Sequence, residues 1–520
     1  MKDNNYKYGK YVSSNQETRW ATSEEIQRVG TYVDLSSDKY EGAGLPLLSN
    51  GKEAYVDNKD THTLIFGSTG SKKTRLFCMP MLNIFAKAGE SFVATDPKGE
   101  LYAKTSGIMK ANGYDVVVLN FRDIGKGDMW NPLALPYELY HSGKREEAIS
   151  FLNDFVATIA APQFERTADV FWPQMASSFA LANLLLLMES AKKEEVNMAS
   201  LARMCAMDNE EPLTGLSEYM DPESLAGMNY KGVLVAADRT RQSIYVSLFG
   251  MVRIFNTQRN LTLMLSGNTI DIKSIGKRKT AVYIIVPDEK TTYHFLVTTF
   301  IKQVYETLIT EAQRSPGQKL PVRVNFVLDE FCNIPRIPDM PSMISAARSR
   351  NMRFYLVAQS IHQLIAKYDK DANTIKGNCD NWVFLTSKEL ALLNEISELC
   401  GTVYTAENRQ RRLISVSELQ RLDKEKGEAL IMHARQYPII TEIADIDSYK
   451  AFKGYPTVEM KSFELPKISV FSVKDLYDEV RKGKRVAPFS KESEEGANPD
   501  DPLEQLRRMF NDSVDSTTES

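Results

Sequence analysis

The chain has 520 residues, which is more than one ordinary domain holds and enough for two or three. Its apolar fraction of 43% and charged fraction of 25% are those of a soluble globular protein with a large core. The formal net charge of −4 excludes a bulk polycation, so any nucleic acid must be bound through local basic patches.

Cysteine usage and the apolar runs indicate the compartment. The five cysteines are scattered and form no CxxC pair, which argues against a disulfide framework or a zinc ribbon and favours a reducing, cytoplasmic environment. The first 18 residues are polar and lack the apolar core of a signal peptide. The most apolar run, 179–188, is too short to span a bilayer, and we expect it to form a buried core helix.

Short apolar runs recur along the chain, and each is followed by turn residues and a helical stretch. Several are nearly continuous Val, Ile, Leu and Phe, which is typical of strands buried on both faces of a mostly parallel sheet. The alternation with helices predicts an α/β fold built of βαβ units. The expected strands are 63–66, 92–95, 116–120, 282–286, 325–328, 354–358 and 383–385.

A helical insertion interrupts this pattern. Between about 144 and 234 the chain is rich in Ala, Leu, Met and Glu and shows no convincing strand, with candidate helices at 145–160, 172–192 and 197–207. The last stretch is polar and acidic, which is typical of a mobile tail. We expect a nucleotide-binding domain in two parts, 1–143 and 235–489, which flank an all-α domain at 144–234. A disordered acidic tail is expected at 490–520.

The first strong motif is a candidate P-loop between an apolar strand and a helix. It reads Gly67-Ser68-Thr69-Gly70-Ser71-Lys72-Lys73-Thr74. The glycines let the backbone curl, so that its N–H groups point at phosphate oxygens, and the following helix adds its positive end. Lys73 is expected to reach the β- and γ-phosphates of ATP, and Thr74 to hold Mg²⁺. The alternative without a function is a Gly/Ser turn that only joins a strand to a helix, and the strand–loop–helix context disfavours it.

One P-loop residue departs from the pattern G-x-x-x-x-G-K-[ST]. Lys72 stands where the pattern has glycine. Its side chain either crowds the nucleotide, forces an unfavourable backbone angle, or points outward harmlessly. The sequence leaves these alternatives open.

An acidic strand end supplies the expected second half of the site. The run 322–328 is apolar and is followed by Asp329 and Glu330. At the carboxyl end of a central strand, Asp329 is expected to orient Mg²⁺ and Glu330 to polarise the attacking water. Such a pair is commonplace in solvated turns, but the P-loop upstream favours the functional interpretation. Two further candidates are Gln359, as a γ-phosphate sensor, and Arg348, as an arginine finger for an adjacent subunit or a residue of a solvated helix face.

Together these motifs resemble the type IV coupling proteins, the TraG/TraD group of conjugative ATPases. The resemblance spans about 20–444 and is carried by the P-loop and by Asp96-Pro97-Lys98-Gly99-Glu100-Leu101, Trp130-Asn131-Pro132-Leu133, Leu328-Asp329-Glu330-Phe331 with Asn333-Ile334, Ala347-Arg348-Ser349-Arg350, and Gln359-Ser360. The Asp-Pro-Lys-Gly-Glu signature is far more specific than a P-loop alone.

The resemblance implies a RecA-like ATPase with an inserted all-α domain that helps to recognise a relaxase–DNA complex. It implies homo-hexamers around a channel, ATP with Mg²⁺ at subunit interfaces, and DNA passing to type IV secretion channel proteins at the cytoplasmic face of the membrane. A sequence-tolerant pump contacts phosphates, so basic clusters at 277–279 and at Arg409, Arg411 and Arg412 are candidate pore contacts, although each also fits a solvated turn.

Two departures keep alternatives open. Lys72 puts turnover in doubt and supports a degenerate ATPase that serves as an adaptor between relaxase and channel. The family usually carries transmembrane helices before the segment that resembles 19–22, and their absence here implies a truncated soluble form or a membrane-anchored partner. A non-conjugative DNA translocase of the same motor class is the remaining alternative, which the Asp-Pro-Lys-Gly-Glu signature disfavours.

Overall fold

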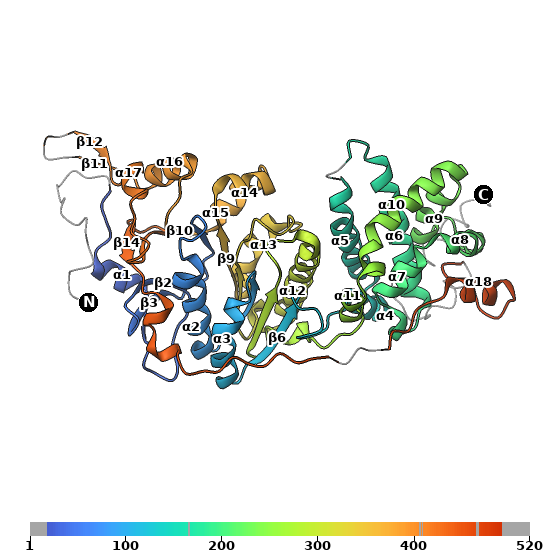
Figure 1. Ribbon diagram of the computed structural model, residues 1–520, viewed down its shortest axis with the longest axis horizontal. Helices are drawn as coiled ribbons and strands as arrows, with labels where there is room; N and C mark the ends of the chain where they lie inside the picture. The colour runs from blue at the N-terminus through green and yellow to red at the C-terminus, as the bar shows by residue number, and fades with distance from the viewer. Residues whose placement is uncertain (1–17, 165–166, 405–406, 408, 464–466, 491–520) are drawn as a thin grey trace, which may run out of the picture. The chain divides into compact units, whose positions relative to one another are not determined.

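The computed structural model describes residues 18–164, 167–404, 407, 409–463 and 467–490, and it divides into two compact units (Figure 1). The sheet unit comprises 1–130 and 268–464, and the helical unit comprises 131–267 and 465–520. The helical unit is thus larger than the expected 144–234. Residues 238–257 pack against 171–190 and 198–204, and residues 473–481 pack against 210–217, so both segments belong to the helical unit. The expected tail after Ser490 lies outside the described residues.

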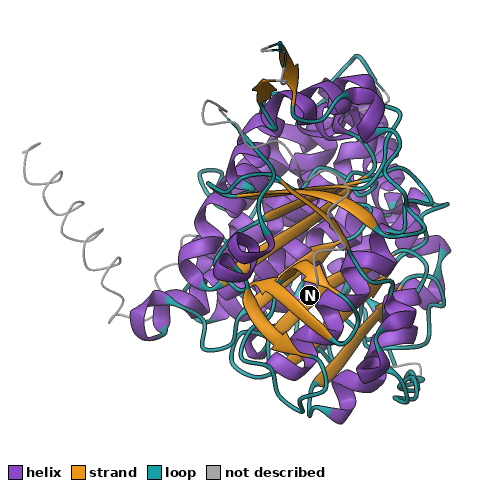
Figure 2. Ribbon diagram, turned by 90° about the vertical axis from the view of Figure 1, so that its left-hand side faces the viewer, coloured by secondary structure: helices purple, strands orange, loops and turns teal. Residues whose placement is uncertain are grey.

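The sheet unit is built on a nine-stranded, mostly parallel sheet, which confirms the expected fold class (Figure 2 views it from its β14 edge). Its strand order is β14-β13-β10-β4-β9-β8-β5-β7-β6, and only β13 runs opposite to the other strands. The strands are β4 (Thr63–Phe66), β5 (Ser91–Asp96), β6 (Asp115–Asn120), β7 (Thr280–Ile285), β8 (Val324–Leu328), β9 (Met352–Ala358), β10 (Asn381–Phe384), β13 (Glu428–His433) and β14 (Ile439–Glu442).

Helices cover both faces of this sheet, so its central strands are buried throughout, as their nearly continuous apolar runs predict. On one face lie α2 (Met79–Ala88) and α3 (Glu100–Ala111). On the other lies α12 (His294–Arg314), whose Tyr305 ring packs against Phe326 and Phe354. Further helices and single turns of this unit include α1 (Ser23–Val29), η1 (Thr74–Cys78), α13 (Met340–Ala347), η7 (Arg348–Arg350), α14 (Ile361–Tyr368), α15 (Asp371–Asn378), α16 (Leu390–Leu399) and α17 (Val416–Leu419).

Two small antiparallel sheets accompany the large one. The strands β1 (Thr31–Asp34), β2 (Leu45–Ser49) and β3 (Glu53–Asp57) form a sheet in the order β1-β3-β2. The strands β11 (Thr402–Tyr404) and β12 (Gln410–Arg412) form an exposed hairpin. The apolar side of the three-stranded sheet joins the core between α2 and the large sheet, so it is part of the same folding unit.

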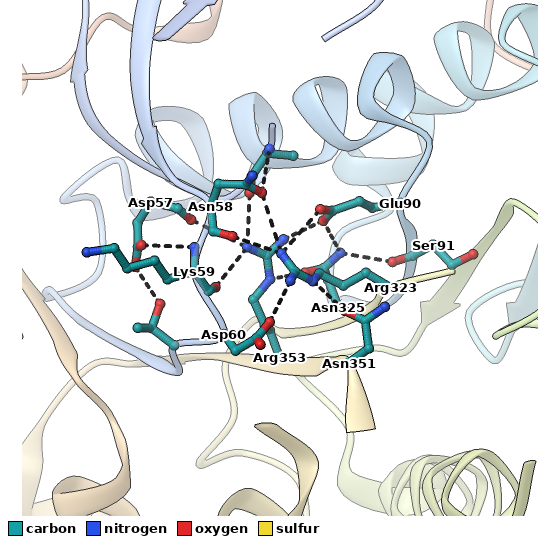
Figure 3. Close-up of polar contacts among 12 residues, drawn as sticks. Asp57, Asn58, Lys59, Asp60, Glu90, Ser91, Arg323, Asn325, Asn351 and Arg353 are labelled. Carbon is teal, nitrogen blue, oxygen red and sulfur yellow. Dashed lines mark hydrogen bonds and ion pairs between the residues drawn. The ribbon is translucent and has the colours of Figure 1, made fainter. Parts of the chain in front are cut away.

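A buried arginine ties the amino end of the large sheet together (Figure 3). Arg353 at the start of β9 is fully buried and is ion-paired with Glu90. It also donates to Asn325 Oδ1 at 2.8 Å and to the carbonyl oxygen of Ala43 at 2.9 Å. Arg323 approaches Glu90 from the other side, with Nη1 3.6 Å from Oε1. Because Ala43 precedes β2, this cluster links the small sheet to β8 and β9.

Substituting Arg353 by methionine should destabilise the fold, because it leaves the largely buried carboxylate of Glu90 without its closest partner. We expect the free energy of unfolding to fall by at least about 3 kcal/mol. Urea unfolding of the full chain measures this. The matched control is Arg336→Met, which removes an exposed ion pair with Asp371 and should change stability by less than about 1 kcal/mol. Equal effects of the two substitutions would contradict the assignment.

The helical unit consists of helices packed on a central apolar helix, which confirms an all-α region at this point of the chain. The central helix, α6 (Phe171–Ser190), packs against α5, α9 and α10. The other helices are α4 (Ala134–His141), α5 (Arg145–Phe164), α7 (Met198–Met204), α8 (Glu210–Ser217), α9 (Leu225–Leu234), α10 (Asp238–Thr257), α11 (Arg259–Met264) and α18 (Val473–Arg481).

The apolar run at 179–188 lies inside α6. Among the described residues, α6 is the one helix whose length and mean hydropathy of 1.3 would suffice to cross a membrane, and 67% of that window is buried against other parts of the protein. The expectation of a buried core helix therefore holds for α6.

Candidate active site

The P-loop, residues 67–74, connects the carboxyl end of β4 to η1. Its start is fixed by two neighbouring strands, because Gly67 N–H donates to the carbonyl of Ala358 at 3.2 Å and Ser68 N–H to that of Thr386 at 2.8 Å. Gly70 has a φ of +77°, which glycine adopts without strain. The loop is therefore held at the edge of the sheet where open α/β folds bind ligands.

Lys73 points into the loop. Its side chain is buried, and Nζ donates to the carbonyl oxygen of Gly67 at 2.6 Å, with Glu330 Oε1 at 3.9 Å. The Ser71 hydroxyl is also buried and has no hydrogen-bond partner among the described residues. A β-carbon on Gly67 would lie 2.4 Å from that hydroxyl, so only glycine fits there. An ammonium and an unsatisfied hydroxyl inside a curled backbone fit a phosphate group.

Lys72 combines two of the alternatives that the sequence leaves open. Its φ is +66°, an angle that suits glycine, and its side chain points away from the loop to Glu425, with Nζ 2.6 Å from Oε2. The residue therefore keeps the backbone shape of the missing glycine at a steric cost of about 1–2 kcal/mol. The helix that follows begins with a π-helical turn at Thr74–Cys78. Such turns are rare and concentrate at functional sites.

Thr74 and Asp329, the two expected Mg²⁺ ligands, lie within hydrogen-bonding distance of each other. Asp329 follows β8, is buried, and accepts a hydrogen bond from Thr74 Oγ1 at 2.8 Å. Burial raises the pKa of Asp329 to about 6, against the opposing effect of that hydrogen bond. A hydroxyl and a carboxylate this close are the oxygen ligands that Mg²⁺ prefers, and the ion's charge would keep Asp329 ionised.

Glu330, Gln359 and Thr69 are connected in a chain of hydrogen bonds. Gln359 Nε2 donates to Glu330 Oε2 at 2.8 Å, and its Oε1 accepts from Thr69 Oγ1 at 3.2 Å. Glu330 has a φ of +53°, a strained conformation of the kind that clusters at active sites. Gln359 therefore connects the P-loop to the expected catalytic carboxylate, which is where a γ-phosphate sensor must lie.

Arg348 does not join these residues. It lies in η7, just before β9, and is ion-paired with Asp380, which directly precedes β10. The P-loop follows the carboxyl end of β4, and β4 runs parallel to β9 and β10. Arg348 therefore lies at the amino ends of these strands, on the side of the sheet opposite to the P-loop. Within one chain it cannot contact a nucleotide in the P-loop.

The basic clusters are largely engaged within the sheet unit. Lys277 pairs with Glu311 at 2.6 Å, and Lys279 donates to the carbonyl of Asn112 at 2.6 Å. In β12, Arg412 lies 3.4 Å from Glu398. That one of these clusters contacts DNA stays a prediction.

Sequence reasoning missed the role of Asp96 and the partner of Lys72. Asp96 ends β5, and its Oδ2 accepts from the backbone N–H of Tyr102 at 2.8 Å, so that it caps α3. Burial raises the pKa of this carboxyl to about 6. The sequence feature that could have predicted this cap is the Asp-x-x-Gly spacing from Asp96 to Gly99, because Gly99, at a φ of +75°, turns the chain into α3. Lys98 is exposed, and Asn131 lies in the helical unit, where it donates to the carbonyl of Val196 at 2.7 Å.

These features define a P-loop NTPase: a phosphate loop after β4, a Thr–Asp pair, and a Glu–Gln pair at the carboxyl ends of adjacent parallel strands. Residues 19–430 match the family model described as Type IV secretory system Conjugative DNA transfer, and the chain belongs to this family.

Comparisons with individual proteins agree. The chain is 24% identical over 419 residues to the conjugal transfer protein TraG of Escherichia coli, covering 74% of this chain and 64% of TraG. It is 29% identical over 176 residues to the type 4 coupling protein DotL of Legionella pneumophila, covering 31% of this chain and 22% of DotL. The chain thus spans less than two thirds of the length of these relatives.

Solved structures of the plasmid coupling protein TrwB have the same fold. TrwB in complex with the ATP analogue ADPNP superposes with a TM-score of 0.62 at 13% identity, covering 88% of this chain and all of that one. TrwB in complex with ADP and Mg²⁺ superposes with a TM-score of 0.58 at 14% identity, covering 86% and 98%. The expected RecA-like P-loop fold is thereby confirmed.

Proposed function

We propose that the chain is an ATP-dependent coupling protein that brings a relaxase–DNA complex to a type IV secretion channel and drives the DNA into it. The observation that carries the proposal is the hydrogen-bonded site in which Lys73, Thr74, Asp329, Glu330 and Gln359 converge. Membership of the conjugative DNA-transfer family supplies the substrate class. It also favours this function over a non-conjugative translocase.

In the proposed reaction each side chain has a separate task. Lys73 neutralises negative charge that builds up on the β- and γ-phosphates of ATP. Thr74 and Asp329 hold Mg²⁺, which supplies Lewis-acid stabilisation of the phosphate oxygens when bound. Glu330 polarises the attacking water, and Gln359 orients it from the neighbouring strand. The complexes of TrwB with ADPNP and with ADP and Mg²⁺ support these ligands for the same fold.

Hydrolysis with and without single-stranded DNA tests the proposal. We expect phosphate release from ATP by the full chain to rise when a long single strand of mixed sequence is added, because a motor couples turnover to its track. If no concentration of DNA changes the rate of hydrolysis, the translocation function is contradicted.

We place the working protein at the cytoplasmic face of the membrane, together with channel proteins and the relaxosome, and as a homo-hexamer.

Arg348 is proposed to complete the site of the adjacent subunit. Arg348 lies at the amino ends of the strands, whereas its own P-loop lies at their carboxyl ends, so it can contact only a nucleotide bound by another subunit. Arg348→Ala and Lys73→Ala should each be inactive alone, but mixing them should restore hydrolysis. In mixed rings, a Lys73→Ala subunit supplies its Arg348 to the intact P-loop of a neighbouring Arg348→Ala subunit. Absence of any recovery on mixing, with mixed rings confirmed by differential tagging, would contradict a role in trans.

Replacing Lys72 by glycine distinguishes the motor from the adaptor, the second function that this residue supports. The backbone angle is already that of glycine and the amine points to Glu425, so glycine releases the strain and removes this ion pair without removing a group that points into the loop. For a motor, we expect turnover to be retained or raised by up to about tenfold. Lys72→Ala is the matched control, since it removes the charge and keeps the strain. No hydrolysis in the native chain or in either variant would favour the adaptor.

A further inference from the structure

Four polar side chains form a stripe on one face of α12. They are His294, Thr298, Lys302 and Tyr305, whose spacing of i, i+4, i+8 and i+11 follows the helical repeat. All four are buried, and each donates a hydrogen bond to the segment 333–343, which leads from the turn after β8 into α13. The stripe therefore holds this segment over about three helical turns.

Two of these contacts fix the segment at a distance from the candidate active site. Thr298 Oγ1 donates to the carbonyl oxygen of Pro335 at 3.3 Å. The Tyr305 hydroxyl donates to that of Met343 in α13 at 3.0 Å. Both satisfy buried groups of the chain after the turn, so their role is to pack α12 against α13.

His294, at the start of α12, differs from the others because it binds two segments. Its Nδ1 donates to the carbonyl oxygen of Asn333 at 3.0 Å, and its Nε2 to that of Pro287, just after β7, at 2.8 Å. A carbonyl oxygen only accepts, so the ring makes both hydrogen bonds only when each nitrogen carries a proton. His294 thus ties the loop after β7 to the turn after β8, and β5 lies between these two strands.

Asn333 contacts Glu330 through both its backbone and its side chain. Its N–H donates to the carbonyl oxygen of Glu330 at 2.8 Å, and its Nδ2 donates to Glu330 Oε2 at 3.4 Å. The same carboxylate oxygen accepts from Gln359 at 2.8 Å. Glu330 has a φ of +53°, and a strained conformation of this kind persists only where its surroundings hold it. Asn333 is part of those surroundings.

We propose that His294 is a positioning residue for ATP hydrolysis. By fixing Asn333, it holds the carboxylate of Glu330 in the orientation that activates the attacking water. Its loss should slow the chemical step and leave ATP binding unchanged, because the groups that bind the phosphates and Mg²⁺ belong to the P-loop and Asp329. The inference rests on the proposed function and adds to its site a buried residue of α12.

Two substitutions of His294 separate its two hydrogen bonds. The amide nitrogen of asparagine can take the place of Nδ1, and that of glutamine the place of Nε2. His294→Asn therefore keeps the hydrogen bond to Asn333, whereas His294→Gln keeps the one to Pro287. Each variant leaves one buried carbonyl without its donor, so we expect similar falls in melting temperature. The decisive measurement is ATP hydrolysis by the full chain with single-stranded DNA, resolved into kcat and KM.

His294→Gln should lower kcat about tenfold to a hundredfold, because a displacement of about 1 Å in a catalytic group has an effect of this size. KM should stay close to that of the native chain. His294→Asn, the conservative variant, should recover most of the lost kcat. Thr298→Val is the matched control, since it removes a buried hydrogen bond one turn along the stripe and should lower stability without lowering kcat.

A double-mutant cycle tests whether His294 acts through Glu330. In the Glu330→Gln background, His294→Gln should cause no further loss of the single-turnover rate, because the side chain that it positions is no longer a base. If the two losses instead multiply, His294 acts by another route and the inference is overturned.

The outcomes also separate the inference from the proposed function. If the native chain hydrolyses ATP and His294→Gln matches its kcat, His294 does not position Glu330, and the proposed function stands. Equal losses of kcat in the two His294 variants would likewise reduce its role to stability. If the native chain does not hydrolyse ATP, both the inference and the motor function are overturned.

Discussion

Glu330→Gln should bind ATP with native affinity and hydrolyse it about a thousandfold more slowly. Glutamine preserves the size of the side chain and can still contact Gln359, so the geometry of the site is retained. It cannot polarise the attacking water, because the amide is not a base. Single-turnover hydrolysis together with binding of a fluorescent ATP analogue measures the two effects separately.

The control for this substitution is Glu100→Gln, which neutralises an exposed carboxylate in the first turn of α3, after the carboxyl end of β5. If Glu330 acts chemically, the control leaves turnover unchanged. If both variants hydrolyse ATP at the native rate, another residue activates the water, and the assignment of Glu330 is wrong.

Lys73→Ala should abolish nucleotide binding at concentrations that saturate the native chain, and turnover should fall about a thousandfold. The Lys73 ammonium is buried inside the loop, where water screens charge poorly, so its loss removes most of the positive potential at the phosphates. The rise in melting temperature that ATP and Mg²⁺ give the native chain should disappear. This reports binding without reference to hydrolysis.

Lys72→Ala is the matched control, since it removes the neighbouring lysine on the same loop. The structure directs Lys72 to Glu425, away from the loop, so we expect this variant to keep its thermal shift with ATP. Equal loss in both variants would show that the two lysines act on the nucleotide together, which contradicts the geometry of the loop.

The central strands were predictable because local pattern and final environment agree. Strands β4, β5, β8 and β9 are buried on both faces, and their sequences are nearly continuous apolar runs. The edge formed by β13 and β14 was not predicted, whereas β6 at the other edge was. The apolar segments at β13 and β14 pair antiparallel at one edge, where no motif marks them, and β1 to β3 lie in a mixed stretch before the P-loop.

Side chains that depend on distant partners were beyond sequence reasoning. Arg353 begins an otherwise apolar strand, and its burial is explained by Glu90, which is 263 residues earlier. Lys72 is directed outward by Glu425, which is 353 residues later. Both pairs depend on the tertiary fold, and no local spacing announces them. The end of the helical segment was expected at 234 and lies at 267 in the structure for a similar reason, because α10 joins the helical unit through contacts with α6 and α7.

The position of the candidate site on the sheet was predictable from the sequence. The P-loop and the acidic strand are contiguous motifs, and a parallel sheet brings the carboxyl ends of β4, β8 and β9 to one edge. Gln359 could be placed by the same rule. The position of Arg348 could not be predicted in this way, because its proposed partner is another subunit. The capping of α3 by Asp96 was recognised only once the structure showed the turn at Gly99.

The most direct test of the account is ATP-driven displacement of streptavidin from biotinylated single-stranded DNA, with the biotin at the 5′ end in one substrate and at the 3′ end in the other. We expect the native chain to accelerate displacement from one end only, in the presence of ATP and Mg²⁺, and Glu330→Gln to be inactive. DNA-stimulated hydrolysis without displacement from either end would contradict the claim that this protein moves DNA.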